Sequence, residues 1–312
     1  MQDLPSILGD ISADQFLAEY WQKKPLLIRN AILNFKSPIS ADELAGLSLD
    51  RDVESRLIFE KGELKPWSIK HGPFDEYIFK NLPEKHWTLL VQAVDLWVPK
   101  VKELADYFSF LPAWRIDDIM ASYAPAGGSV GPHFDHYDVF LLQGSGQRKW
   151  QLGQACDSMT PTLPDTPITI LSDFRSEKEW ILNPGDMLYV PPKIAHWGVA
   201  HTDCVTYSIG FRSPSLVDML GDITSMLASR NYSSYYKDPP LTPSMAKTAI
   251  DPLFIDQVKS VLRELIKDDA LLNDWFARYM TQPKYPDLSE DLDEKRVAEA
   301  GGIRYVNGEQ NA

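Results

Sequence analysis

The most informative stretch of the chain is His133-Phe134-Asp135-His136-Tyr137-Asp138-Val139-Phe140. Its apolar end predicts a strand over 134–143. Side chains alternate between the two faces of a strand, so His133 and Asp135 would share one face, and His136 and Asp138 the other. We therefore predict that His133 and Asp135 point together into the interior of a sheet structure.

A second histidine further along the chain can join this pair. His196 follows the apolar run Met187–Val190 and the turn Pro191-Pro192, and it precedes a predicted strand, Trp197–Ala200. This order places the imidazole at the start of a strand, near the mouth of a barrel. His201 is the competitor, but it stands at the far end of the same strand and precedes a polar turn. We therefore favour His196.

Together, His133, Asp135 and His196 predict a metal site with an open face. Two imidazoles and one carboxylate are the ligand set of non-haem Fe(II) oxygenases. Such a set leaves positions free for a cosubstrate and for dioxygen (O2), as catalytic rather than structural sites do. Each histidine taken singly is more simply a surface or core residue. The ordered set within a strand-rich segment favours a mononuclear Fe(II) site.

The residue pattern from Ile116 to Phe211 is typical of an all-β domain. Short apolar runs alternate with turns rich in glycine and proline, which predicts a sandwich or small barrel. A barrel mouth is a common place for a buried ligand site. The expected strands are Ile119–Tyr123, Phe134–Gln143, Lys149–Leu152, Met187–Val190, Trp197–Ala200 and Val205–Phe211.

Arg148 is the candidate residue for binding an acidic cosubstrate. Gly144-Ser145-Gly146 reads as a hairpin turn, and with a two-residue loop Arg148 would pair with Gln143, on the face of Asp135. A buried guanidinium is costly without an anion, and it clamps a carboxylate with two parallel hydrogen bonds. Arg148 would therefore hold the distal carboxylate of 2-oxoglutarate. Alternatively, it belongs to a solvated hairpin tip, and a three-residue turn would break the parity argument.

Composition narrows the class of partner. The 312 residues include 31 Lys and Arg and 44 Asp and Glu, which gives a net charge of −13. This charge argues against binding to nucleic acid and is compatible with a basic protein as partner. The two cysteines, Cys156 and Cys204, are too few for a disulfide framework, so a reducing cytoplasm is the simplest setting. Met1–Pro5 does not resemble a signal peptide, and no apolar run is long enough to cross a membrane.

Helices are expected on both sides of the strand-rich segment. The later helices carry apolar stripes, which would pack on the barrel or against a second copy of the chain. The expected helices are Ala13–Gln22, a short one opened by a capping box at Ser40, Pro99–Phe108, Ser215–Arg230, Asp251–Lys267 and Leu271–Met280, with N-terminal strands at Leu26–Ile28, Arg56–Phe59 and Thr88–Val91 and another strand starting at Gly301–Tyr305.

Several stretches resemble the JmjC branch of the cupin-fold oxygenases, and most closely the bacterial ribosomal oxygenases. These are arginyl hydroxylases acting on a large-subunit ribosomal protein, L-sixteen. The similar stretches are Tyr20–Ile28, Asp117–Met120, Gly131–Phe140, Gln143–Gly146, Pro184–Pro192 and Tyr207–Arg212.

The resemblance implies a mainly β fold with flanking helices, a double-stranded β-helix (jelly-roll, cupin) core, and a homodimer. The implied parts are 1–98 packing on the barrel, a catalytic barrel at 99–213, a helical dimerisation region at 214–282, and at 283–312 a linker and the start of a winged-helix-like domain. It matches His133, Asp135 and His196 to iron ligands and Arg148 to the residue that holds 2-oxoglutarate. One departure is Ala124, where the family pattern leads us to expect a serine; Ser122 lies on the same face.

The implied activity is Fe(II)- and 2-oxoglutarate-dependent β-hydroxylation of an arginine in a basic ribosomal protein. A histidyl or asparaginyl hydroxylase of the same fold is the nearest alternative, which the charge of the pocket would discriminate. Lysyl demethylation is less favoured, because nothing in the sequence resembles an aromatic cage. A cupin-like binding module without catalysis is the alternative from another class.

Overall fold

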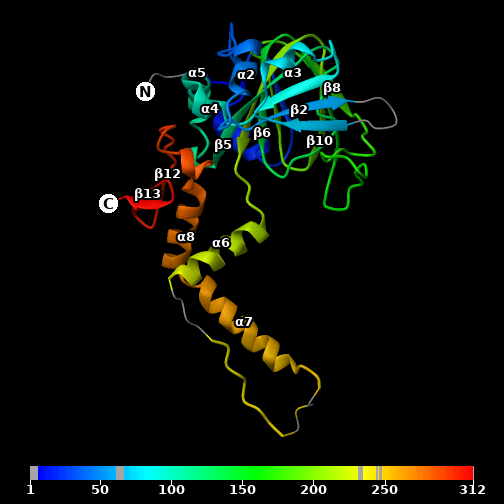
Figure 1. Ribbon diagram of the computed structural model, residues 1–312. Helices are drawn as coiled ribbons and strands as arrows, with labels where there is room; N and C mark the ends of the chain where they lie inside the picture. Colours follow the sequence, from blue (N-terminus) through cyan, green and yellow to red (C-terminus); the bar gives the residue numbers. More distant parts are fainter. Residues whose placement is uncertain (1–5, 61–66, 231–234, 244, 246–247, 312) are drawn as a thin grey trace. The chain divides into compact units, whose positions relative to one another are not determined.

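The computed structural model describes residues 6–60, 67–230, 235–243, 245 and 248–311 (Figure 1). The expectation for Met1–Pro5 lies outside these ranges. The chain divides into two compact units, Met1–Ser213 and Pro214–Ala312. Each unit is described by itself.

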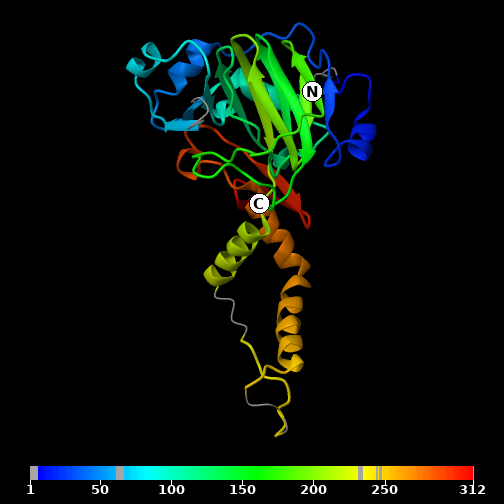
Figure 2. The same cartoon turned by 90° about the vertical axis from the view of Figure 1, so that its right-hand side faces the viewer.

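The first unit is built on two antiparallel sheets (Figure 2). The second sheet has the order β10 (Ile194–Ala200), β7 (Arg148–Ala155), β8 (Lys178–Leu182). The main sheet has eight strands in the order β1 (Leu26–Ile28), β9 (Met187–Val190), β6 (Val139–Ser145), β11 (Cys204–Phe211), β5 (Ile116–Ala124), β4 (Trp87–Val91), β2 (Ser55–Glu60), β3 (Trp67–His71).

The two sheets pack face to face around an apolar cluster. Val139, Leu141 and Leu188 from the main sheet meet Trp150 and Leu152 from the second sheet in this cluster. Side chains from both sheets thus fill one interior, as in a jelly-roll. The expected double-stranded β-helix core is confirmed.

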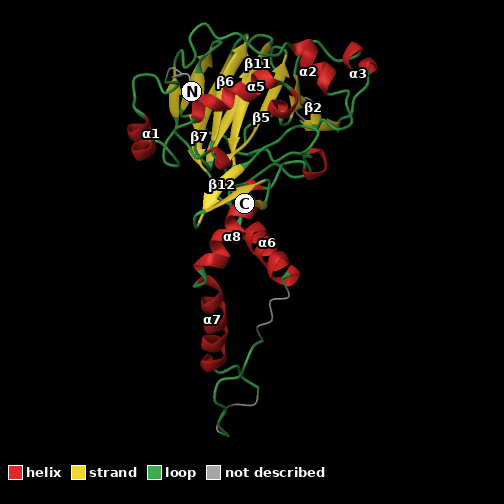
Figure 3. Cartoon of the chain, turned by 90° about the vertical axis from the view of Figure 1, so that its left-hand side faces the viewer, coloured by secondary structure: helices red, strands yellow, loops and turns green. Residues whose placement is uncertain are grey.

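The outer face of the main sheet is covered by the N-terminal helices (Figure 3). Strand alternation sends Tyr207 and Ile209 of β11 to this outer core, whereas Thr206 and Ser208 take the opposite face. The covering elements are α1 (Ala13–Glu19), α2 (Ala41–Leu47), α4 (Val94–Trp97), α5 (Pro99–Lys102) and a 3-10 turn (Glu103–Phe108), while α3 (Glu76–Lys80) lies between β3 and β4 in the chain.

The N-terminal helix is shorter than its sequence predicts. We expected it to reach Gln22, but α1 ends at Glu19, and Gln22 has a left-handed backbone with φ of 57°. Its backbone N–H donates to the Tyr189 hydroxyl at 2.7 Å, and its side-chain amide donates to Asp138 at 3.0 Å. Contacts to strands distant in sequence therefore override the helical pattern.

Two predictions for the segment between β5 and β7 are wrong. β6 begins at Val139, so the stretch 134–138 is not a strand. β6 and β7 lie in different sheets, so Arg148 does not pair with Gln143 as expected. The turn carries the chain from one sheet to the other. Gly146, at φ of 61°, makes this possible, because a Cβ there would lie 1.9 Å from the carbonyl oxygen of Asp203.

In its described residues the second unit contains three α-helices, a 3-10 turn (Pro286–Leu288) and a small sheet. The helices are α6 (Leu216–Ser229), α7 (Pro252–Ile266) and α8 (Asp269–Thr281), and no described helix is long and apolar enough to cross a membrane. The expected strand at 301–305 is wrong in its start, because Gly301 and Gly302 form the turn of a hairpin. The sheet consists of β12 (Val297–Ala300), β13 (Ile303–Val306) and β14 (Glu309–Asn311).

Candidate metal centre

His133 and His196 are brought together by backbone pairing. The two residues form an isolated antiparallel bridge, with N–H···O distances of 3.0 Å from His133 to His196 and 2.8 Å in return. Side chains of directly paired residues leave the backbone on the same side, so the two rings lie with centroids 4.3 Å apart. The sequence argument from parity within one strand is therefore wrong in its premise. Cross-strand pairing places these two rings.

The backbone also fixes which nitrogen of each ring is free. Nδ1 of His133 lies 2.9 Å from the carbonyl oxygen of Gly131, and Nδ1 of His196 lies 3.0 Å from that of Ile194. A carbonyl oxygen only accepts, so both Nδ1 atoms carry the proton. Both Nε2 lone pairs are then available to a metal, in the arrangement usual for metal-binding histidines.

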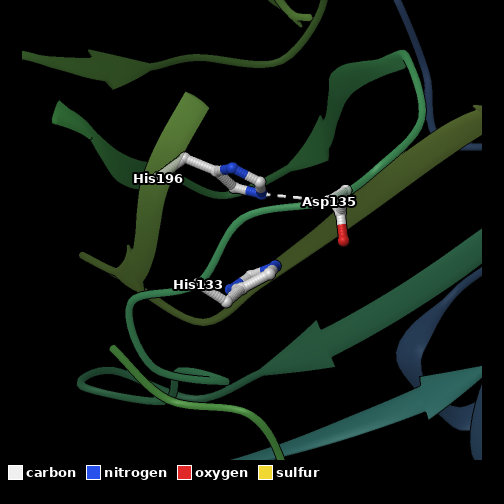
Figure 4. Close-up of side chains that lie close together, drawn as sticks. All are labelled: His133, Asp135 and His196. Carbon is white, nitrogen blue, oxygen red and sulfur yellow. Dashed lines mark ion pairs between the residues drawn. The ribbon is translucent and has the colours of Figure 1, made fainter. Parts of the chain in front are cut away.

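Asp135 completes the cluster (Figure 4). Its Oδ2 lies 3.5 Å from Nε2 of His196, and the ligand atoms of His133, Asp135 and His196 all lie within 4.8 Å of one another. The loop is held in place because the carbonyl of Asp135 accepts from the N–H of Lys193 at 2.7 Å. This is the only such group among the described residues, and its donor set fits Fe(II).

The protonation state of His196 suits a ligand. Burial, followed by the neighbouring His133, lowers its pKa to about 4, although Asp135 opposes the shift. The ring is therefore neutral near pH 7. A neutral imidazole binds a metal without first losing a proton.

The competing residues of the sequence stretch lie elsewhere. His136 is exposed, and so is His201, whose backbone N–H donates to Gln147. Asp138 is fully buried on the opposite side, where it accepts from the Tyr189 hydroxyl at 2.6 Å and lies 3.7 Å from Arg115. Its carboxylate ties the loop to the N-terminal segment.

Arg148 lies inside the barrel. It is 3% exposed and stands at the first position of β7, paired with Ala200 of β10. Its Nε and Nη2 atoms are buried with no hydrogen-bond partner in the described part of the chain. The alternative of a solvated hairpin tip is therefore wrong. An uncompensated buried guanidinium costs several kcal/mol, so an anion such as a carboxylate fits this position.

Ala200, which pairs with Arg148, belongs to a small apolar cluster. Ala124, Ala200 and Cys204 form one buried cluster, so no hydroxyl is offered at these positions. The hydroxyl of Ser122 donates instead to the carbonyl of Thr206, at 3.4 Å. The sequence reasoning also missed Trp150, whose ring centroid lies 6.0 Å from that of His196. Its place at two positions from Arg148, on the same face of β7, was the signal that could have found it.

Tyr137, which follows the metal-site residue Asp135 in the chain, is influenced by three carboxylates. Desolvation of the Tyr137 hydroxyl and its hydrogen bond to Asp135 raise the pKa of Tyr137 well above its usual value, and Asp118 and Asp117 add to the effect. Asp118 is buried and accepts from the backbone N–H of Ala93 at 2.9 Å. The surroundings of Tyr137 are therefore anionic.

Comparison with known proteins gives the family. The JmjC-domain family model matches residues 103–219. The chain is 36% identical over 271 residues to the ribosomal protein uL16 3-hydroxylase of Escherichia coli (strain K12), a match covering 86% of this chain and 71% of that protein. It is 38% identical over 263 residues to the probable ribosomal oxygenase of Haemophilus influenzae, covering 83% of this chain and 64% of that protein.

Solved structures agree. The ribosomal oxygenase YcfD of Escherichia coli, in complex with cobalt and 2-oxoglutarate, matches with a TM-score of 0.84 at 33% identity, over 97% of this chain and 86% of that one. Its complex with cobalt and succinic acid matches with a TM-score of 0.83 at 33% identity, over 97% of this chain and 86% of that one. The chain thus belongs to the JmjC-domain ribosomal oxygenases.

Proposed function

We propose that this oxygenase uses Fe(II) and 2-oxoglutarate to hydroxylate the β-carbon of an arginine in a basic large-subunit ribosomal protein, uL16. One observation carries the proposal. A cluster of His133, Asp135 and His196 shares one barrel interior with Arg148, whose buried Nε and Nη2 atoms have no hydrogen-bond partner among the described residues. The Escherichia coli relative, named a uL16 3-hydroxylase, supports the substrate, because position 3 of an amino acid is its β-carbon.

In this proposal each residue has a defined role. His133 and His196 would offer their Nε2 atoms and Asp135 a carboxylate oxygen, a set that leaves positions of the metal open. Fe(II) bound there supplies, with 2-oxoglutarate and O2, the oxidation that inserts oxygen into an unactivated C–H bond. Arg148 receives the distal carboxylate of 2-oxoglutarate. The apolar cluster around Trp150 and Leu152 keeps bulk water out of the interior.

The mouth of the site supports an arginine rather than a neutral side chain. Tyr137 is 41% exposed, and the carboxylates of Asp135, Asp118 and Asp117 act on it. A guanidinium near them gains from their charge and stacks on a tyrosine ring. Arg212 balances part of this charge through its ion pair with Asp117 at 3.2 Å, and the remaining negative charge favours a cationic substrate over a histidyl or asparaginyl one.

The second unit supports a homodimer. No residue of α7 is buried, and several of its apolar side chains are exposed, with Val258 at 42%, Leu262 at 58% and Ile266 at 62%. An exposed apolar stripe of this kind typically packs against a partner. We propose that residues 99–213 carry catalysis, that 214–282 form the dimerisation region, and that 283–312 belong to a winged-helix-like part. The cytoplasm, where ribosomal proteins are made, is the proposed location.

The test measures 2-oxoglutarate turnover by the Fe(II)-loaded chain with uL16 peptides, followed by mass spectrometry. We expect succinate and the gain of one oxygen atom on a single arginine, and neither product with His133→Ala. A matched peptide with lysine in place of that arginine should not be modified. Oxygen gained on a histidine or asparagine instead would overturn the arginyl assignment. Turnover that survives His133→Ala would overturn the metal site.

A further inference from the structure

Trp150 stands between the metal-site residues and Arg148. In the pairing of β7 with β10, His196 faces Leu152, Gly198 faces Trp150 and Ala200 faces Arg148. Alternate residues of a strand share a face, so Trp150 and Arg148 point into the same interior as His196. The indole centroid lies 6.0 Å from the His196 ring and 5.8 Å from Cζ of Arg148.

The position of the indole is fixed by its neighbours. Gly198 has no side chain, and a Cβ there would lie 2.7 Å from the six-membered ring of Trp150. The ring therefore lies directly against the bare backbone of β10. The same side chain packs in the apolar cluster with Leu152 and Leu188. Little freedom remains for the indole to turn toward another partner.

The indole N–H has no partner among the residues that the structure describes. Nε1 of Trp150 is buried and has no hydrogen bond within the described ranges of the chain. Buried Trp N–H groups usually find an acceptor, and leaving one unpaired is unfavourable. Nε of Arg115 and Nε1 of Trp97 share this state, but neither residue lies on the face of β7 that carries Arg148. Two unpaired donors on adjacent inward positions of one strand indicate one acceptor between them.

We propose that Trp150 Nε1–H donates a hydrogen bond to the distal carboxylate of 2-oxoglutarate, beside Arg148. The inference rests on the proposed function, since it takes the cosubstrate as the anion. A carboxylate has two oxygens and accepts several hydrogen bonds, so it satisfies a guanidinium and an indole together. Ala124, Ala200 and Cys204 offer no hydroxyl at that end. Trp150 is thus the second donor of the pocket.

The test compares ligand affinities of the full chain loaded with redox-inactive Mn(II), by calorimetry. Trp150→Phe keeps an aromatic ring and removes the N–H. Because hydrogen bonds to charged groups are the stronger ones, we expect roughly tenfold weaker binding of 2-oxoglutarate. Oxalate binds the metal but is too short to reach Trp150, so its affinity should not change. Trp180→Phe is the matched control, because Trp180 packs partly buried against the same cluster.

Three outcomes distinguish a failure of the inference about Trp150 from a failure of the proposed function on which it rests. If Trp150→Phe binds 2-oxoglutarate within twofold of wild type, or weakens oxalate equally, the role of the indole N–H is refuted. If wild type binds no 2-oxoglutarate, the proposed function itself fails. If Trp150→Phe does not fold, 3-benzothienylalanine at position 150 keeps the bicyclic shape without the N–H, and must give the same loss of affinity.

Discussion

Replacing Arg148 by methionine should stabilise the empty protein and abolish its response to 2-oxoglutarate. Two guanidinium nitrogens of Arg148 are buried without partners among the described residues, and each unsatisfied group costs about 1–3 kcal/mol. Methionine retains most of the aliphatic stem. We expect the metal-free, ligand-free Arg148→Met protein to gain about 2 kcal/mol, since replacing buried charges by apolar groups is often stabilising by about 1–4 kcal/mol.

The assay is urea unfolding followed by tryptophan fluorescence, which reports the first unit because every tryptophan except Trp275 lies in residues 1–213. With an m-value of about 3 kcal/mol/M, the midpoint should rise by about 0.7 M. With Mn(II) already saturating, adding 2-oxoglutarate at a hundred times its dissociation constant for wild type should stabilise wild type by about 2.7 kcal/mol and leave Arg148→Met at the stability it has with Mn(II) alone. Arg175→Met, at an exposed arginine, is the control. A lower midpoint for empty Arg148→Met would refute the reasoning, because the guanidinium would then be compensated within the fold.

Three other predictions follow from the site and the second unit. The pKa of His196 is lowered to about 4, so between pH 6.5 and pH 4 the unfolded chain binds a proton that the folded chain does not. The free energy of unfolding of the metal-free protein should therefore fall as the pH drops through this range. The urea midpoint of His196→Gln should depend less steeply on pH over the same range. Asp138 accepts hydrogen bonds from Gln22 and from the Tyr189 hydroxyl, and Asp138→Asn would place an N–H donor against one of these donors. The substitution should lower the free energy of unfolding by about 2 kcal/mol and leave the Mn(II) affinity unchanged. A loss of metal binding would contradict the placement of Asp138 away from the site. Leu262→Glu in α7 should convert a dimer to a monomer in light scattering, whereas Lys259→Glu, at an exposed charge, should not.

Local pattern predicted much of the first unit. β9 was predicted at its observed bounds, and β5, β10 and β11 were predicted to within a few residues, because alternating or continuous apolar runs are set by burial of one or both faces. The capping box at Ser40 is also present as expected. Two strands were missed: β8 carries charged and exposed side chains, and β3 is buried only at Trp67 and ends in the exposed Lys70 and His71. Neither has a strong period of its own, so only its neighbours in the sheet specify it.

The side chains available for the chemistry can be identified from the residue types alone: two imidazoles, a carboxylate and an arginine near glycine turns. How they come together follows from the strand pairing of the folded chain. His133 lies beside His196 through a bridge between distant segments, and Arg148 enters the interior because β7 pairs with β10 rather than with β6. The pairing of β7 with β10 also places Trp150 in this interior, opposite Gly198. Such pairings are formed by backbone hydrogen bonds between distant segments, and a local pattern of residues does not encode which strands will pair.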